Sequence, residues 1–255
     1  MKKKTICLII AAAMLLSIVS CTPEASKFKR KVKHVSFSDL SVSSQDAADH
    51  EHQESSGFNG DEDTTASKQP GKKVQDTDLV RVKDYILDVD VELLYATERN
   101  FTGKVIYSFD EAWLRYGTVK KLKKAQKLAK KEGYSLKIWD AFRPVSAQFD
   151  LWNEFPHPKY VSDPNKGFSA HSRGNTVDVT LVDDEGWELE MPSGFDSFSR
   201  LADRDYSDVK NRKAVVNAEL LENIMKECGF KPYAGEWWHF TDSEKYDVEM
   251  DFLPQ

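Results

Sequence analysis

The sequence predicts an α+β fold, in which helices flank a small and mostly antiparallel sheet. Residues 110–132 and 215–228 repeat apolar side chains at helical spacing, whereas residues 135–140 and 176–181 alternate apolar and polar side chains as half-buried strands do. Hydrophobic residues make up 40% of the 255 residues. This composition supplies one sizeable core and excludes a wholly disordered chain.

The charge and cysteine content exclude two further classes of protein. Basic residues number 36 and acidic residues 42, so the net charge is −6 and nucleic acid is not an expected partner. The three cysteines are Cys7, Cys21 and Cys228. Because the first two lie in the amino-terminal segment described next, one thiol remains in the body of the chain, and a disulfide scaffold is excluded.

The amino terminus has the pattern of an export signal. Lys2, Lys3 and Lys4 form a positive stub, and the apolar run at 6–18 is too short to span a bilayer stably. Small residues then precede Cys21, and this segment resembles the lipobox of bacterial lipoproteins. We therefore expect residues 1–20 to be a signal peptide and Cys21 to be lipidated, with an ordinary secretory cleavage as the alternative. Without its first 20 residues the chain carries 33 basic and 42 acidic residues, a net charge of −9.

Polar and charged residues dominate positions 22–78, which are predicted to be a disordered linker after the lipidated cysteine. A flexible stretch of this length spans roughly 40 Å, so a tethered domain would range over a nearby surface. His34, His50 and His52 lie in this stretch and receive no role, because a solvated linker explains them. The folded domain is expected at residues 79–255.

The first helix of this domain is predicted at 110–132, with Asp110 as its N-cap and Gly133 as its left-handed stop. A strand follows at 135–140, because Leu136 and Ile138 alternate with polar residues.

Two further helices are predicted. Pro144 suits the first turn of a helix that ends near residue 155. Another amphipathic helix runs over 215–228 and is capped by Gly229, which makes Cys228 a core residue.

Residues that bear chemistry concentrate in two short segments. In the first, a loop through Gly174 leads into the strand at 176–181, where Val177 and Val179 face one way and Asp178 the other. His171 precedes Asp178 by seven residues across the glycine turn, so both side chains can meet at one cation.

The second segment, 236–240, contains Glu236 and His239. In a regular strand these two side chains would point to opposite faces, so joint use requires a turn or bulge, which Gly235 favours. Two imidazoles and one carboxylate form a three-ligand set for zinc that leaves a fourth position for water, as in catalytic sites. Taken singly, each residue has a structural alternative, and Trp237 and Trp238 are more often core residues.

Several ordered motifs resemble the zinc D-alanyl-D-alanine dipeptidases of the VanX type. Their wider group includes D,D-carboxypeptidases, lysostaphin-like endopeptidases and the Hedgehog signalling domain. The matching pieces are Tyr95-Ala96-Thr97, Asn100-Phe101-Thr102-Gly103, Trp139-Asp140-Ala141-Phe142-Arg143-Pro144, the segment 171–178, Gly194-Phe195-Asp196 and the segment 236–240. They recur in the order of the family over about residues 85–240, which is nearly the whole expected domain.

The resemblance implies roles for seven residues. By this resemblance, one zinc ion is bound by His171, Asp178 and His239, and Glu236 is the catalytic carboxylate. Arg143 would lie beside the substrate carbonyl. Asp196 would receive the substrate amino group, with Ser169 hydrogen-bonding nearby.

Two of these roles have alternatives, and two features depart from the family. Arg143 alternatively forms a surface ion pair with Asp140, and Asp196 alternatively only forms a turn. Thr176 stands where the family usually has alanine, and the loop between 155 and 169 is short against some members, which affects the shape of the site and the size of substrate.

The expected activity is zinc-dependent hydrolysis of D-Ala-D-Ala or similar small peptides in cell-wall peptide turnover. Alternatives are a D,D-carboxypeptidase or endopeptidase acting on stem peptides, and a non-catalytic wall-binding lipoprotein. The expected location is outside the inner membrane, on the periplasmic or cell-surface side, with a lipid anchor to a bacterial membrane. The expected partners are a small peptide and that membrane, with no nucleic acid and no obligate protein partner.

Overall fold

The computed structural model describes residues 73–254. The predicted signal peptide, Cys21, the three linker histidines and the other linker residues before 73 lie outside this range. Three α-helices occur in the described residues: α1 (Tyr116–Lys131), α2 (Val145–Glu154) and α3 (Arg212–Glu227). Among these residues, no helix has both the length and the apolar character that crossing a bilayer requires.

The principal sheet of the described domain has five strands. Its spatial order is β2 (Asp90–Val91), β4 (Ser135–Asp140), β5 (Thr176–Val182), β7 (Glu236–Asp242) and β6 (Phe230–Tyr233). Only the short edge strand β2 is parallel to its neighbour, and all other pairs are antiparallel. A separate antiparallel pair joins β1 (Leu79–Arg81) to β3 (Trp113–Arg115). The predicted α+β class with a mostly antiparallel sheet is confirmed.

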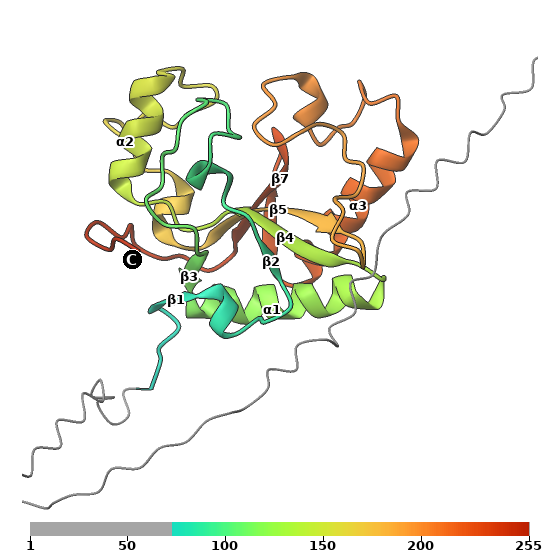
Figure 1. Ribbon diagram of the computed structural model, residues 1–255, viewed down its shortest axis with the longest axis horizontal. Helices are drawn as coiled ribbons and strands as arrows, with labels where there is room; N and C mark the ends of the chain where they lie inside the picture. Colours follow the sequence, from blue (N-terminus) through green and yellow to red (C-terminus); the bar gives the residue numbers. More distant parts are fainter. Residues whose placement is uncertain (1–72, 255) are drawn as a thin grey trace, which may run out of the picture. The chain divides into compact units, whose positions relative to one another are not determined.

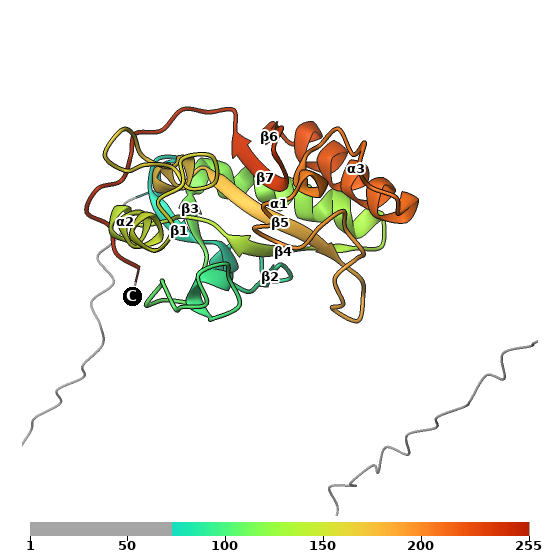
Figure 2. The ribbon, with the colours of Figure 1, turned by 90° about the horizontal axis from the view of Figure 1, so that it is seen from above.

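The two longer helices cover one face of the sheet. In Figure 1, α1 runs beneath β4 and β5, and Figure 2 shows α3 beside β6 and β7. Figure 2 looks from above and shows α2 apart from these helices, near the opposite end of the molecule. The core between sheet and helices is fully buried and includes Leu122, Ala125, Leu136, Ile138, Val177, Val179, Leu181, Leu221 and Met225. The other face of the sheet carries Asp178 and His239 together with two buried aromatic residues, Trp139 and Trp237.

The strand predicted at 135–140 is β4, with the same bounds. The helix predicted at 110–132 is wrong at its start, because α1 begins at Tyr116 and Asp110 is not its N-cap. Residues 113–115 instead pair with β1, and the Val82 amide donates to the Ala112 carbonyl at 2.8 Å. This pairing joins residues 32 to 36 positions apart and overrides the local helical pattern. Gly133 has the expected positive φ of 85° after the helix.

The other two helices begin one residue later and three residues earlier than predicted. Pro144 is the N-cap of α2, so the helix starts at Val145 rather than at the proline. Helix α3 starts at Arg212 because Asn211 caps it, accepting from the amides of Lys213 at 3.0 Å and Ala214 at 3.4 Å. At its other end Cys228 is buried, as predicted.

Candidate active site

Antiparallel pairing of β5 and β7 places Asp178 directly opposite His239. All seven residues of β5 are buried, with Val177 and Val179 in the core between sheet and helices. Because side chains alternate along a strand, Asp178 points to the opposite face, as the sequence predicted. Directly opposed residues of an antiparallel pair have adjacent side chains, so the sheet itself brings this carboxylate and this imidazole together.

His171 reaches the same place from a short 3-10 helix, Ala170–Arg173. The Ser169 hydroxyl accepts from the His171 amide at 3.3 Å and starts this turn, and Gly174, with φ of 71°, ends it. The Nδ1 of His171 lies 2.8 Å from the Ala141 carbonyl oxygen. Since a carbonyl can only accept, Nδ1 carries the proton, and the lone pair on Nε2 faces Asp178 and His239.

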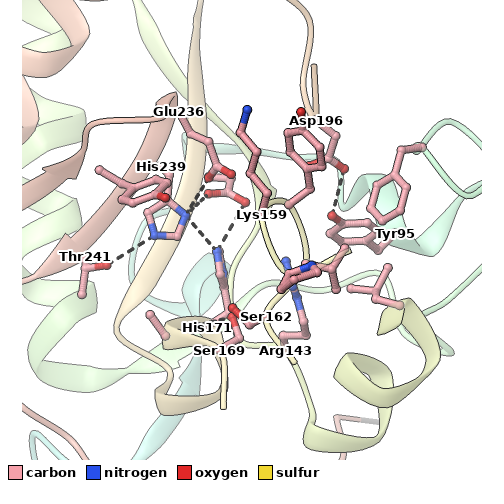
Figure 3. A pocket seen from close by; sticks show the side chains of 18 of the residues that line it. Tyr95, Arg143, Lys159, Ser162, Ser169, His171, Asp196, Glu236, His239 and Thr241 are labelled. Atoms are coloured by element: carbon pink, nitrogen blue, oxygen red, sulfur yellow. Dashed lines mark hydrogen bonds and ion pairs between the residues drawn. The ribbon is translucent and has the colours of Figure 1, made fainter. Parts of the chain in front are cut away.

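The donor atoms of the three residues form a compact triangle, which Figure 3 shows in part. The Nε2 of His171 lies 3.3 Å from Nδ1 of His239 and 3.4 Å from Oδ2 of Asp178. The third side, from Nδ1 of His239 to Oδ1 of Asp178, is 3.0 Å. Tetrahedral zinc with bonds of about 2.05 Å would separate its ligands by about 3.3 Å, so the triangle has the size that a metal ion requires.

The charges at this triangle also favour a cation. Oδ1 of Asp178 is buried and accepts no hydrogen bond, which is costly for a carboxylate unless a cation compensates. Burial alone would raise the pKa of Asp178, but the neighbouring His171 and His239 hold it well below its usual range. The three side chains are 3%, 5% and 16% exposed for His171, Asp178 and His239, so little water screens their charges.

Glu236 lies beside His239 because the pairing of β6 and β7 breaks between them. Tyr233 pairs with Glu236, but the preceding Pro232 pairs with Phe240, so the register of the two strands shifts between Pro232 and Tyr233. This irregularity brings the Glu236 carboxylate to 3.4 Å from Nδ1 of His239, as the predicted bulge requires. The pKa of Glu236 is raised above its usual value, mainly by burial. The charge of Asp178 adds to this rise, and His239 opposes it.

The two tryptophans that follow Glu236 are fully buried, at 0% for Trp237 and 1% for Trp238. They do not line the cavity that contains the predicted site. They are core residues, which was the structural alternative.

Arg143 is both ion-paired and part of the site. Its Nη2 and Nε donate to Oδ2 of Asp140 at 2.6 and 3.3 Å, and its Nη1 donates to Gln148 at 2.9 Å. The pair with Asp140 exists, but it is buried rather than at the surface. Burial would lower the pKa of Arg143, yet the charge of Asp140 holds it well above its usual value. Of the five guanidinium N–H groups, two remain free for a ligand.

Asp196 occupies the far side of the cavity from the imidazoles. Its φ of 54° is left-handed, as the turn-forming alternative requires. The Tyr95 hydroxyl donates to its Oδ2 at 2.8 Å, as Figure 3 shows. Burial raises the pKa of Asp196 well above its usual value, although the bond from Tyr95 lowers it. An ammonium group bound here would stabilise the carboxylate.

One cavity of about 440 Å³ contains all of these side chains. Each of the seven residues predicted for the site lines it: Arg143, Ser169, His171, Asp178, Asp196, Glu236 and His239. A further wall comes from residues 158–162 of the loop after α2. The structure thus brings together the seven residues to which the sequence assigned a role in the site.

Some residues around the site were not assigned a role in the sequence. Gln148 holds Arg143 and also donates to the Ser162 carbonyl at 2.8 Å; its signal was a polar residue on the buried face of α2. The bonds from Tyr95 to Asp196 and from Tyr107 to Asp140 span 101 and 33 residues, and no local pattern indicates them.

The unusual Thr176 does not line the cavity. Its hydroxyl lies 3.1 Å from that of Thr241, and the Thr241 hydroxyl lies 3.5 Å from Nε2 of His239. The Thr176 hydroxyl therefore contacts the site through Thr241 and forms no part of the cavity wall.

Comparison with known proteins agrees with this geometry. A model of the D-Ala-D-Ala dipeptidase family, peptidase family M15, matches residues 75–253. The D-alanyl-D-alanine dipeptidase of Escherichia coli K12 is 39% identical over 164 residues, 64% of this chain and 84% of the relative. Those of Streptomyces coelicolor and Enterococcus faecium are each 34% identical, over 69% and 58% of this chain and 97% and 82% of their own lengths. The chain belongs to the D-Ala-D-Ala dipeptidase family of metallopeptidases.

Proposed function

We propose that this protein hydrolyses D-Ala-D-Ala, or a closely similar small peptide, with one zinc ion held by His171, Asp178 and His239. The observation that carries the proposal is the donor triangle beside Glu236, in a cavity that also holds a buried cationic group and a buried carboxylate. The names of the relatives support the same substrate. A cavity of about 440 Å³ suits a small molecule.

Zinc, when bound, supplies Lewis-acid activation and lowers the pKa of a water molecule to about 7. Glu236 lies beside the donor triangle, where it would accept the proton of the attacking water. It then gives the proton to the nitrogen of the departing alanine as the peptide bond breaks. Burial raises the pKa of Glu236 towards the range in which a carboxyl group both accepts and returns a proton.

Arg143 provides the electrostatic contribution. As the water attacks, the peptide carbonyl oxygen becomes negatively charged. The two free N–H groups of Arg143 are available to donate to it, while Asp140 and Gln148 hold the guanidinium in a fixed orientation. Donors that are already oriented need not reorganise during the reaction, so they stabilise the transition state effectively.

The dipeptide has a free ammonium group, and Asp196 is its proposed partner. The carboxylate is held by Tyr95 and lines the same cavity as the donor triangle. Ser169 also lines this cavity, which supports a hydrogen bond from the substrate there. Pairing a buried ammonium with a carboxylate offsets the cost of removing both from water.

The proposed location is the outer side of a bacterial membrane, with a lipid anchor at Cys21. The basic stub, the short apolar run and the small residues before Cys21 support it. At this location the substrate pool would be peptides released during wall turnover. Recovery of the activity in cytosolic rather than membrane fractions would contradict this location.

The first test is release of free D-alanine from D-Ala-D-Ala by the full chain, with a chelator and with added zinc. We expect the chelator to abolish release and zinc to restore it. The same enzyme should act poorly on N-acetyl-D-Ala-D-Ala, which lacks the ammonium group. Faster release of D-alanine from longer stem peptides would favour the carboxypeptidase alternative, and no release from any substrate would favour a wall-binding protein.

A further inference from the structure

The outer face of α1 carries a band of lysines that the proposed activity does not use. The helix contains seven lysines and no acidic residue. Six are exposed and follow one another at helical steps: Lys120, Lys123, Lys124, Lys127, Lys130 and Lys131. We call these six residues the lysine face. At 1.5 Å per residue they extend over about 17 Å of helix.

Most of this positive charge has no partner within residues 73–254. Lys120 forms an ion pair with Asp76 at 2.7 Å, and the half-buried Lys121 pairs with Asp242 on β7. For the other five lysines of the lysine face, no ion pair is present in the described part of the chain. Positive charge is thus concentrated on one face of a chain whose net charge is −6.

Helix α3 provides an internal comparison, because it also has 16 residues and a solvent-exposed side. Its charges have both signs: Arg212, Lys213 and Lys226 with Glu219, Glu222 and Glu227. Mixed charges of this kind are typical of a helix that only faces water. The one-signed face of α1 instead complements a negatively charged surface.

The proposed lipid anchor at Cys21 makes a membrane the negatively charged surface that this domain would meet first. The Gly117 amide in the first turn of α1 donates to the Asp76 carbonyl at 3.0 Å, and Asp76 pairs with Lys120. The described part of the chain therefore begins beside the amino-terminal end of α1, where Figure 1 also places β1.

We infer that the lysine face docks the domain on the headgroups of anionic phospholipids and that the active-site cavity then opens away from the bilayer. Leu122, Ala125 and Ala129 of α1 pack into the core between sheet and helices, whereas Asp178 projects from the other face of the sheet. Docking through α1 thus turns the donor triangle towards the wall. The inference rests on the proposed location and not on the proposed activity.

The test measures how fast an acetylating reagent modifies each lysine of the full, lipid-anchored chain in vesicles, read by peptide mass spectrometry. One set of vesicles is phosphatidylcholine alone, and the other contains roughly one part phosphatidylglycerol in three. We expect Lys123, Lys124, Lys127, Lys130 and Lys131 to react at least about threefold more slowly in the anionic vesicles. About 0.5 M salt should remove this protection, because it shortens the Debye length to about 4 Å.

Three exposed lysines elsewhere, Lys210, Lys213 and Lys245, serve as internal references and should react equally in both vesicles. Two matched triple variants remove the same charge. The variant Lys123→Gln, Lys127→Gln and Lys130→Gln should lose the protection of Lys124 and Lys131. The variant Lys210→Gln, Lys213→Gln and Lys245→Gln should keep it.

Equal labelling of the lysine face in both kinds of vesicle would overturn the inference, as would protection that salt does not reduce. Protection by a soluble polyanionic wall polymer, but not by anionic vesicles, would also overturn it in favour of the wall. D-Ala-D-Ala hydrolysis is measured on the same samples with soluble substrate. Activity without protection rejects only the docking, and protection without activity rejects only the proposed function.

Discussion

Arg143 illustrates how one side chain serves the fold and the site at once. Three of its five N–H groups are bound within the protein, by Asp140 and Gln148, and its guanidinium lies 5.0 Å from the centre of the Tyr95 ring. A lysine could not make these contacts and still present two oriented donors. The ion pair with Asp140 and the role beside the substrate, which the sequence offered as alternatives, are therefore compatible.

Substitution of Glu236 by glutamine should lower kcat for D-Ala-D-Ala by at least about 100-fold, because the amide cannot accept the proton of the attacking water. Bound zinc, measured by atomic emission, should remain at one ion per chain. Glu98→Gln, at an exposed acidic residue that does not line the cavity, is the control and should leave both unchanged. Loss of zinc from Glu236→Gln would instead make this residue a metal ligand.

Substitution of Asp196 by asparagine should raise KM for free D-Ala-D-Ala by about tenfold or more, the usual worth of a charge-assisted hydrogen bond. Asparagine still accepts from the Tyr95 hydroxyl, so the turn at 194–197 is retained. Steady-state kinetics on the free and the N-acetylated dipeptide check this. An equal loss on both substrates would show that Asp196 does not receive the ammonium group.

Most elements with a local cause were predicted well, and boundaries that depend on a distant contact were not. Alternation alone defines β4, and the positive φ of Gly133 ends α1 as expected. The start of α1 was missed because residues 113–115 pair with β1, a contact that no local pattern contains. The start of α3 was missed for a local reason, because the capping power of Asn211 was overlooked.

Removal of this cap by Asn211→Ala should lower the free energy of unfolding by about 1 kcal/mol. The two amides that Asn211 now satisfies would have to find water instead. Urea unfolding followed by circular dichroism measures the change. The matched control, Asn223→Ala in the exposed middle of α3, should be neutral or slightly stabilising, since alanine favours helix. Equal losses in both variants would contradict the capping role.

At the scale of the whole molecule, the site combines residues from β5, β7, the short 3-10 helix Ala170–Arg173 and the loops that hold Arg143, Ser169 and Asp196. The sequence predicted its seven residues because several lie next to recognisable strands and because ordered motifs resemble one family. It did not predict what holds them. The partners of Asp196, Asp140 and Arg143 come from segments whose meeting depends on the complete fold.

Metal binding should stabilise the whole domain, because the triangle of His171, Asp178 and His239 forms only when the segment 171–178 is folded against the distant strand β7. At a free zinc concentration about 1,000-fold above Kd, the stabilisation is about 4 kcal/mol, and Tm should rise by about 10 °C. Calorimetry of the chelator-treated full chain, with and without zinc, checks this. Asp178→Asn should show a much smaller rise; an equal rise in this variant would place the metal elsewhere.

The bond from Gln148 to the Ser162 carbonyl has a consequence for how this enzyme can diverge. Gln148 donates to a backbone carbonyl of the loop and not to a side chain. The support that Gln148 gives to Arg143 therefore does not depend on which amino acid occupies position 162. The neighbouring Lys159 and Tyr160 line the cavity and take no part in this hydrogen bond. Mutations can therefore accumulate along the loop and alter which peptides are accepted while the reaction chemistry is inherited intact.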